Sequence, residues 1–108
     1  MKMTDMKLTD MEKGWFVGPF TPTVLHTDAF ECAVKRYAAG TREARHVHRV
    51  ATEITVIVAG RVRMNGVEHG PDSIVRVEPG TATDFEALTD VVTVVVKTPA
   101  AREDKYVC

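Results

Sequence analysis

Two histidines and a glutamate that could bind one metal ion lie in a short stretch of the chain, His46-Val47-His48 followed by Glu53. If the stretch is extended, His46 and His48 point the same way, because alternate residues of a strand share a face. Two neutral imidazoles and one carboxylate form a facial triad that suits Fe(II), and also Mn, Ni or Zn. The spacing therefore predicts a divalent transition-metal site with ligands His46, His48 and Glu53.

The same stretch also fits a simpler interpretation, a charged surface loop. Arg45 and Arg49 flank the histidines, and a His-x-His pair often occurs by chance. Glu53 favours the metal site, because it heads an apolar run and a carboxylate directed into a core needs a partner. If residues 49–52 form the turn of a hairpin, Glu53 opens the antiparallel strand beside the histidines, as their cross-strand neighbour.

The rest of the chain is predicted to consist of short strands and turns. Runs of alternating or β-branched residues recur roughly every 8–12 residues, as in sandwiches and barrels, and no stretch has a helical period. Asn65-Gly66 is a strong hairpin signal. The pattern predicts an all-β fold, a sandwich or a small barrel. The expected strands lie within residues 14–20, 23–26, 30–37, 44–48, 53–59, 61–64, 67–68, 74–77, 81–88 and 91–97.

Five positions of the central stretch stand at the spacing of a known motif: Gly40, His46, His48, Glu53 and Gly60. In these residues the chain resembles the first motif of the cupin family in full. The resemblance implies a cupin-type β-barrel, also called a double-stranded β-helix or jelly roll, which is usually dimeric. It implies the same three metal ligands that the spacing suggests.

The second cupin motif is only partly matched. Residues 74–80 resemble its beginning, including the proline–glycine turn. The family pattern then places a histidine where this chain has Thr83, and an asparagine where it has Ala87. The resemblance covers about residues 30 to 97. Thr83, water, or Asp84 turned inward by a β-bulge could complete the coordination, although strand alternation directs Asp84 away from the Thr83 face.

Composition excludes some partners and sets an expected location. The 108 residues carry a net charge of -1, with 14 basic and 15 acidic residues, so nothing favours nucleic acid or an anionic membrane. No apolar run approaches the roughly 18 residues that span a bilayer. The N-terminus lacks the apolar region of a secretory signal. We therefore expect a cytoplasmic protein with Cys32 and Cys108 as reduced thiols.

The chain is predicted to fold as an N-terminal arm, residues 1–13, that is flexible or docks on a partner, followed by one domain, residues 14–108. Residues 53–59 and 91–97 are apolar on both faces of their strands. A strand in a monomeric barrel normally has one solvated face. Covering the second face requires the arm or a second copy, which favours a homodimer.

Two classes of function remain open at this point. One is a metal-dependent enzyme that acts on a small polar molecule, such as an oxygenase or isomerase, with the metal as Lewis acid or oxygen-binding centre. The other is a non-catalytic module that holds or senses a small ligand. Catalytic residues are not assigned, since the acid–base candidates near the proposed metal are only Asp84, Glu86 and the histidines themselves. Thr55, Ile57 and Met64 are expected to line the pocket.

Overall fold

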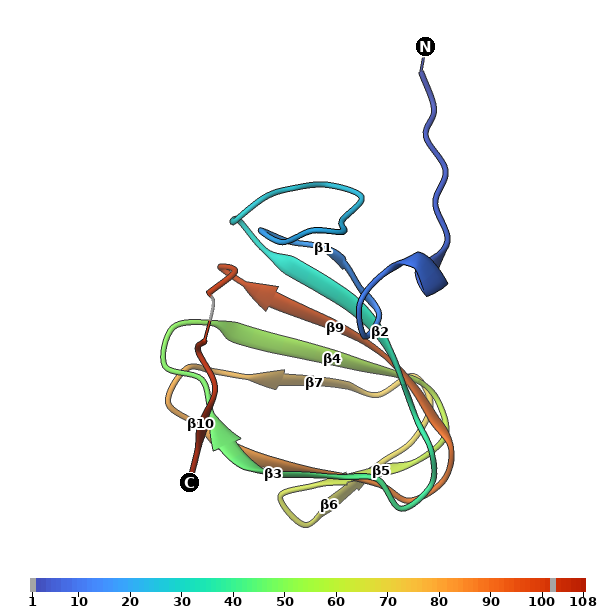
Figure 1. Ribbon diagram of the computed structural model, residues 1–108. Helices are drawn as coiled ribbons and strands as arrows, with labels where there is room; N and C mark the ends of the chain where they lie inside the picture. Colours follow the sequence, from blue (N-terminus) through green and yellow to red (C-terminus); the bar gives the residue numbers. More distant parts are fainter. Residues whose placement is uncertain (1, 102) are drawn as a thin grey trace.

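The protein is an antiparallel β-sandwich, as a computed structural model of residues 2–101 and 103–108 shows (Figure 1). The one 3-10 helix among the described residues is η1, Leu8–Asp10. The predicted all-β fold is therefore confirmed. The strands are β1 (Trp15–Val17), β2 (Glu31–Tyr37), β3 (Arg42–Val47), β4 (Thr52–Ala59), β5 (Val62–Met64), β6 (Val67–His69), β7 (Ile74–Val77), β8 (Ala82–Ala87), β9 (Val91–Thr98) and β10 (Tyr106–Val107).

The strands form two five-stranded sheets that face each other. One sheet has the order β1-β2-β9-β4-β7, and the other has the order β10-β3-β8-β5-β6. Strands β3 and β4 follow each other in the chain but belong to different sheets, so the chain crosses the sandwich between them. The strand expected at residues 23–26 does not form, since there Leu25 makes only an isolated bridge to Val17.

Two glycine-containing turns have the backbone conformation that their sequences favour. Asn65 and Gly66 both have positive φ, 49° and 78°, as a two-residue hairpin turn between β5 and β6 requires. Gly60 has a φ of 86°, and a Cβ added there would collide with the carbonyl oxygen of Asp90. The hairpin prediction is confirmed, and Gly60 is a structural member of the motif stretch.

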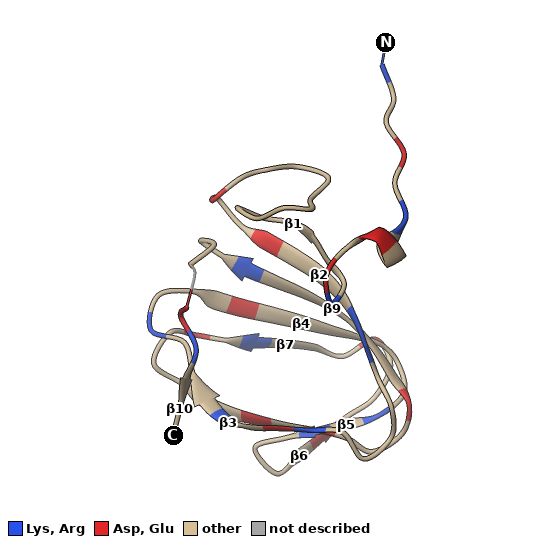
Figure 2. Cartoon of the chain, viewed as in Figure 1, with Lys and Arg blue, Asp and Glu red and all other residues tan. Residues whose placement is uncertain are grey.

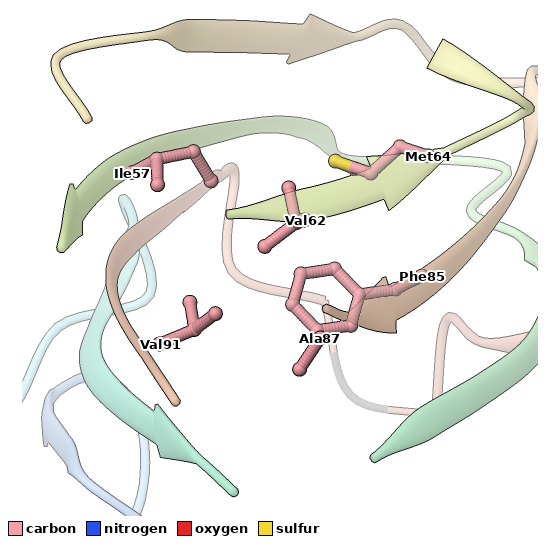
Figure 3. Packing of buried hydrophobic residues seen from close by; sticks show 6 residues of the cluster. All are labelled: Ile57, Val62, Met64, Phe85, Ala87 and Val91. Carbon is pink, nitrogen blue, oxygen red and sulfur yellow. The ribbon is translucent and has the colours of Figure 1, made fainter. Parts of the chain in front are cut away.

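The apolar core fills one end of the sandwich (Figure 3). It consists of Ile57, Val62, Met64, Phe85, Ala87 and Val91, with Tyr37 and Val75 packed against it. Ile57 is fully buried in this cluster, so it packs the core and is not among the residues that line the ligand cavity described below. The other end of the sandwich is left for polar side chains.

The outer face of the β2–β9–β4–β7 sheet is apolar across its central strands. Ile54 and Val56 of β4 lie beside Val96 and Val94 of β9, and these side chains are half-buried. Ile74 at the edge is 69% exposed. The described part of the predicted arm extends away from the body as far as η1 (Figure 1), and Met11 is buried.

No helix within residues 2–101 and 103–108 is both long and apolar enough to cross a lipid bilayer.

Candidate metal centre

The two histidines lie side by side on the inner face at the end of β3. His46 is 8% exposed and His48 6%, and their ring centroids are 5.1 Å apart at an angle of 80°. The prediction that both side chains project from one face is confirmed. Nδ1 of His46 lies 2.9 Å from the carbonyl oxygen of Ala44. Because a carbonyl only accepts, the His46 ring donates through Nδ1 and keeps the Nε2 lone pair free for a ligand.

His48 has a buried nitrogen with nothing to bond. Its Nε2 has no hydrogen-bond partner among the described residues. Burial, together with the neighbouring Lys97 ammonium, lowers the pKa of His48 to about 4. The imidazole is therefore neutral at neutral pH, the form that binds metals.

Glu53 faces the histidines from the opposite sheet, because the expected hairpin does not form. Strand β3 pairs with β8 and β10, whereas β4 pairs with β7 and β9. Strand β4 lies between β9 and β7 in its sheet. Across the sandwich, Oε2 of Glu53 lies 3.7 Å from Nδ1 of His48. Burial raises the pKa of the Glu53 carboxyl, and the Lys97 ammonium opposes that rise.

Thr83 occupies the place opposite His46, where the second motif would supply a histidine. The two residues are Cα partners in the β3–β8 ladder. Thr83 is 7% exposed, and its hydroxyl lacks a hydrogen-bond partner within the described residues. Asp84 instead accepts a hydrogen bond of 2.7 Å from the Asn65 N–H. The structure therefore offers a neutral hydroxyl beside the histidines, while the Asp84 carboxylate is engaged at the hairpin turn.

Glu43 and Lys105 also reach this end of the sandwich, and sequence reasoning missed both. Tyr37 donates a 3.0 Å hydrogen bond to Glu43, and Lys105 lies 3.3 Å from its other oxygen. Although burial raises the pKa of the Glu43 carboxyl, Lys105 and Tyr37 hold it below its usual range. The β3–β8 register shifts between Glu43 and His46, so a residue three positions from His46 also lines the cavity.

Lys97 lies in the middle of a charged row on the inner face. Its Cα partners are Glu31 on β2 and Glu53 on β4, and Figure 2 shows the acid–base–acid row across β2, β9 and β4. Lys97 Nζ is 3.9 Å from Glu31 Oε1. Sequence reasoning missed Lys97, although strand alternation places it on the same face as Thr93 and Val95.

The loop that joins His48 to β4 is held by two contacts from distant parts of the chain. The Asp104 carboxylate, 6% exposed, accepts hydrogen bonds of 2.9 Å from Arg49, 3.1 and 3.2 Å from Val50, and 2.9 Å from Ala51. The N–H of Gly80 donates a 2.7 Å hydrogen bond to the His48 carbonyl oxygen. The turn of the second motif and the C-terminal segment thus fix the backbone around His48.

The three proposed ligands line a cavity of about 290 Å³, the inner cavity, together with Thr83, Glu43, Lys97 and Lys105 among others. All three buried polar side-chain atoms that lack a partner in the described residues belong to residues lining it: His48, Thr83 and Thr93. Within residues 2–101 and 103–108, no three His, Cys, Asp or Glu side chains are grouped closely enough to hold a metal ion. The donor types fit a transition metal, but the carboxylate would have to close on the imidazoles to share it.

The chain matches no protein-family model and no curated protein sequence. It is similar in structure to an uncharacterized conserved protein with a double-stranded beta-helix domain from Klebsiella pneumoniae, with a TM-score of 0.69 and 20% identity over 79% of this chain and 75% of that one. A cupin superfamily protein from Desulfitobacterium hafniense gives a TM-score of 0.63 with 9% identity, over 68% of this chain and 70% of that one.

A bacterial pirin from Escherichia coli, in complex with nickel(II), gives a TM-score of 0.69 with 13% identity. That match covers 82% of this chain and 39% of the pirin chain. At these identities the likeness concerns the fold, and it agrees with the two facing sheets. The chain therefore has a cupin-type fold, the double-stranded β-helix.

Proposed function

We propose that the protein binds a divalent transition metal through His46, His48 and Glu53 and uses it to hold or transform a small polar molecule. The observation that carries the proposal is the cavity in which buried polar atoms remain without partners. Buried polar groups almost always have a hydrogen-bond partner, so each exception needs an explanation. A metal at His48 Nε2, with a ligand near the two threonine hydroxyls, supplies one. The pirin of the same fold, in complex with nickel(II), agrees with a metal in such a domain.

An enzyme is the favoured form of this function, because ionisable groups surround the proposed ligands. The metal would act as a Lewis acid toward a bound oxygen atom. Glu43, held by Tyr37 and Lys105, could accept a proton from a molecule in the cavity. Lys97 could hold a negative charge there, and the buried position of the histidines limits access of bulk water. A non-catalytic ligand-binding module is the alternative, and it needs only the cavity and the metal.

Metal stoichiometry tests the proposal directly. The untagged chain would be freed of metal with a chelator, then titrated separately with Mn²⁺, Fe²⁺, Ni²⁺ and Zn²⁺. We expect one metal ion to bind per chain. Isothermal titration calorimetry, and elemental analysis after dialysis, would measure this stoichiometry. If none of the four metal ions binds, the proposed metal-dependent function is wrong, whether it is catalytic or not.

We also propose that two copies associate through the outer face of the β2–β9–β4–β7 sheet. The accessible surface is 6790 Å², whereas a compact monomer of 11.9 kDa exposes about 6,000 Å². The extended arm contributes to this excess, so the argument for the sheet face rests on its half-buried apolar row, Ile54, Val56, Val94 and Val96. The Arg76–Glu78 ion pair beside this face could exchange partners across a two-fold axis, which suits a second copy.

Sedimentation analysis should therefore show a dimer, and Val94→Lys should shift it to monomer. The substitution places a charge in the middle of the proposed interface, where desolvating it is unfavourable. Val67→Lys, at an exposed position on β6 of the opposite sheet, is the matched control. A wild-type chain that stays monomeric at high concentration would contradict the proposal.

A further inference from the structure

A second hollow, the outer cleft, opens beside the metal cavity and differs from it in character. It measures about 440 Å³, and its apolar wall consists of Trp15, Phe20, Pro22, Ala51 and Ala101. Trp15, His48 and Lys97 line both the outer cleft and the inner cavity. The two hollows therefore meet at these residues, and one ligand could occupy both.

An aromatic pair shapes the apolar wall of the outer cleft. The Trp15 and Phe20 rings meet edge to face, with centroids 6.5 Å apart and planes at 72°. Gly18 lets the Phe20 ring lie against the backbone, since a Cβ at that position would collide with the ring. A glycine and an aromatic contact thus hold the pair in place. Such a wall favours a flat apolar group, which gains both buried area and ring contacts.

Two lysines flank Trp15 where the outer cleft meets the inner cavity. The ammonium of Lys35 is 5.5 Å and that of Lys97 is 5.1 Å from the centre of the Trp15 ring. Lys35 donates to the uncharged carbonyl of Lys13 at 3.2 Å. Lys97 and Glu31 are 3.9 Å apart, beyond hydrogen-bond range. Glu53 is the neighbour of Lys97 on the other side. Lysines nonetheless outnumber carboxylates around the inner cavity, which is lined by Lys13, Lys35, Lys97 and Lys105 against Glu43, Glu53 and Asp84.

The acids around the two hollows set the direction in which an anion would bind. Glu43 is neutralised by Lys105 at 3.3 Å, and Asp84 is bonded to the Asn65 amide. In the outer cleft carboxylates outnumber lysines, since Glu12, Glu31, Glu103 and Asp104 line it against Lys13, Lys97 and Lys105. An anionic group is repelled there and attracted inward, while an apolar group fits the wall outside.

We propose that the inner cavity and outer cleft together bind a small organic acid, with its carboxylate at Lys97 and its aromatic body against Trp15 and Phe20. The inference rests on the proposed function in taking the inner cavity as the ligand site, but its residues lie outside the proposed metal ligands. It narrows the substrate class from small polar molecules to aromatic or similarly flat acids.

Trp15 is the one tryptophan in the sequence, so its fluorescence reports binding at this site. Phenylacetate, acetate and phenethyl alcohol would be titrated in turn, because they separate the charge from the ring. We expect phenylacetate to bind at least about tenfold more tightly than either of the others, equivalent to about 1.4 kcal/mol. No saturable change with phenylacetate at millimolar concentration, or equal affinities for all three probes, would overturn the inference.

Three variants test which residues cause the preference for phenylacetate. Lys97→Met should remove the preference for phenylacetate over phenethyl alcohol, and Lys97→Arg should retain it. Phe20→Ala should weaken phenylacetate severalfold and leave acetate unchanged, with circular dichroism confirming the fold. An acid preference that survives Lys97→Met would refute the assignment. Measuring metal content in the same samples separates the outcomes: phenylacetate can bind a chain that holds no metal, and a metal-loaded chain can fail to bind it.

Discussion

Replacing His48 with alanine is expected to lower the affinity for a divalent transition metal at least about 100-fold, since loss of a residue that merely supports a ligand already costs about 10–100-fold. The lost Nε2 has no hydrogen-bond partner among the described residues, and Nδ1 lies 3.7 Å from Glu53 Oε2, beyond hydrogen-bond range, so the substitution breaks no short contact of the ring. Thermal melts of the metal-free chain should therefore show a much smaller effect than the metal titration. Glu53→Gln should also lower the affinity for the metal, because the amide keeps the shape of the carboxylate but not its charge.

Substitutions at other sites show whether the loss is specific. His26→Ala is the matched control, because His26 is exposed and lies in the loop after β1. Thr83→His should instead raise the affinity for the metal by about tenfold or more, because it adds an imidazole opposite His46. If His48→Ala binds metal as tightly as the wild type, the metal lies elsewhere and the ligand assignment is wrong.

Replacing Asp104 with alanine is expected to destabilise the fold by about 3–5 kcal/mol, within the range for breaking a buried, charge-assisted hydrogen-bond set. The carboxylate is 6% exposed and binds three successive N–H groups of Arg49, Val50 and Ala51. Asp104→Asn keeps one acceptor oxygen and should cost about half as much. Urea denaturation measures both, and Glu103→Ala, at an exposed neighbour, is the control.

The pH dependence of the stability difference between the wild type and Asp104→Asn tests whether the charge of Asp104 causes that difference. Burial raises the pKa of Asp104, but the N–H donors of Ala51, Arg49 and Val50 outweigh it, and the folded pKa lies below the ordinary value. The stabilisation is therefore fully present above the unfolded pKa of about 3.9 and is lost as pH falls through the folded pKa. The gap between wild type and Asp104→Asn should be constant above about pH 5 and shrink below about pH 4. A stability difference that is equally large at pH 7 and below pH 4 would show that the charge of Asp104 is not its cause.

Local pattern was sufficient where the structure depends on neighbours in the chain. The shared face of His46 and His48 follows from the two-residue period of a strand, and the Asn65-Gly66 turn follows from residues that tolerate positive φ. Lys97 could have been placed by the same alternation, on the Thr93 and Val95 side of its strand. Local geometry therefore predicted the placement of two of the three proposed metal ligands and could also have placed Lys97 on the inner face.

Pattern failed where packing between distant segments decides. Glu53 was expected beside the histidines in a hairpin, but β4 pairs with β7 and β9 and presents it across the sandwich. The register shift that turns Glu43 inward leaves no signature in residue types. Asp104 and Lys105 act through the position of the last segment, which no period in the sequence encodes.

The clamp from Asp104 also sets the order in which the protein can become functional during synthesis. Its hydrogen bonds join residues 53 to 55 positions apart, so the loop beside His48 is made long before the group that fixes it. A nascent chain that ends short of Asp104 carries every proposed metal ligand, yet its ligand loop is held by the Gly80 contact alone. Tight metal binding is therefore expected only after Asp104 has been synthesised and has docked on the loop.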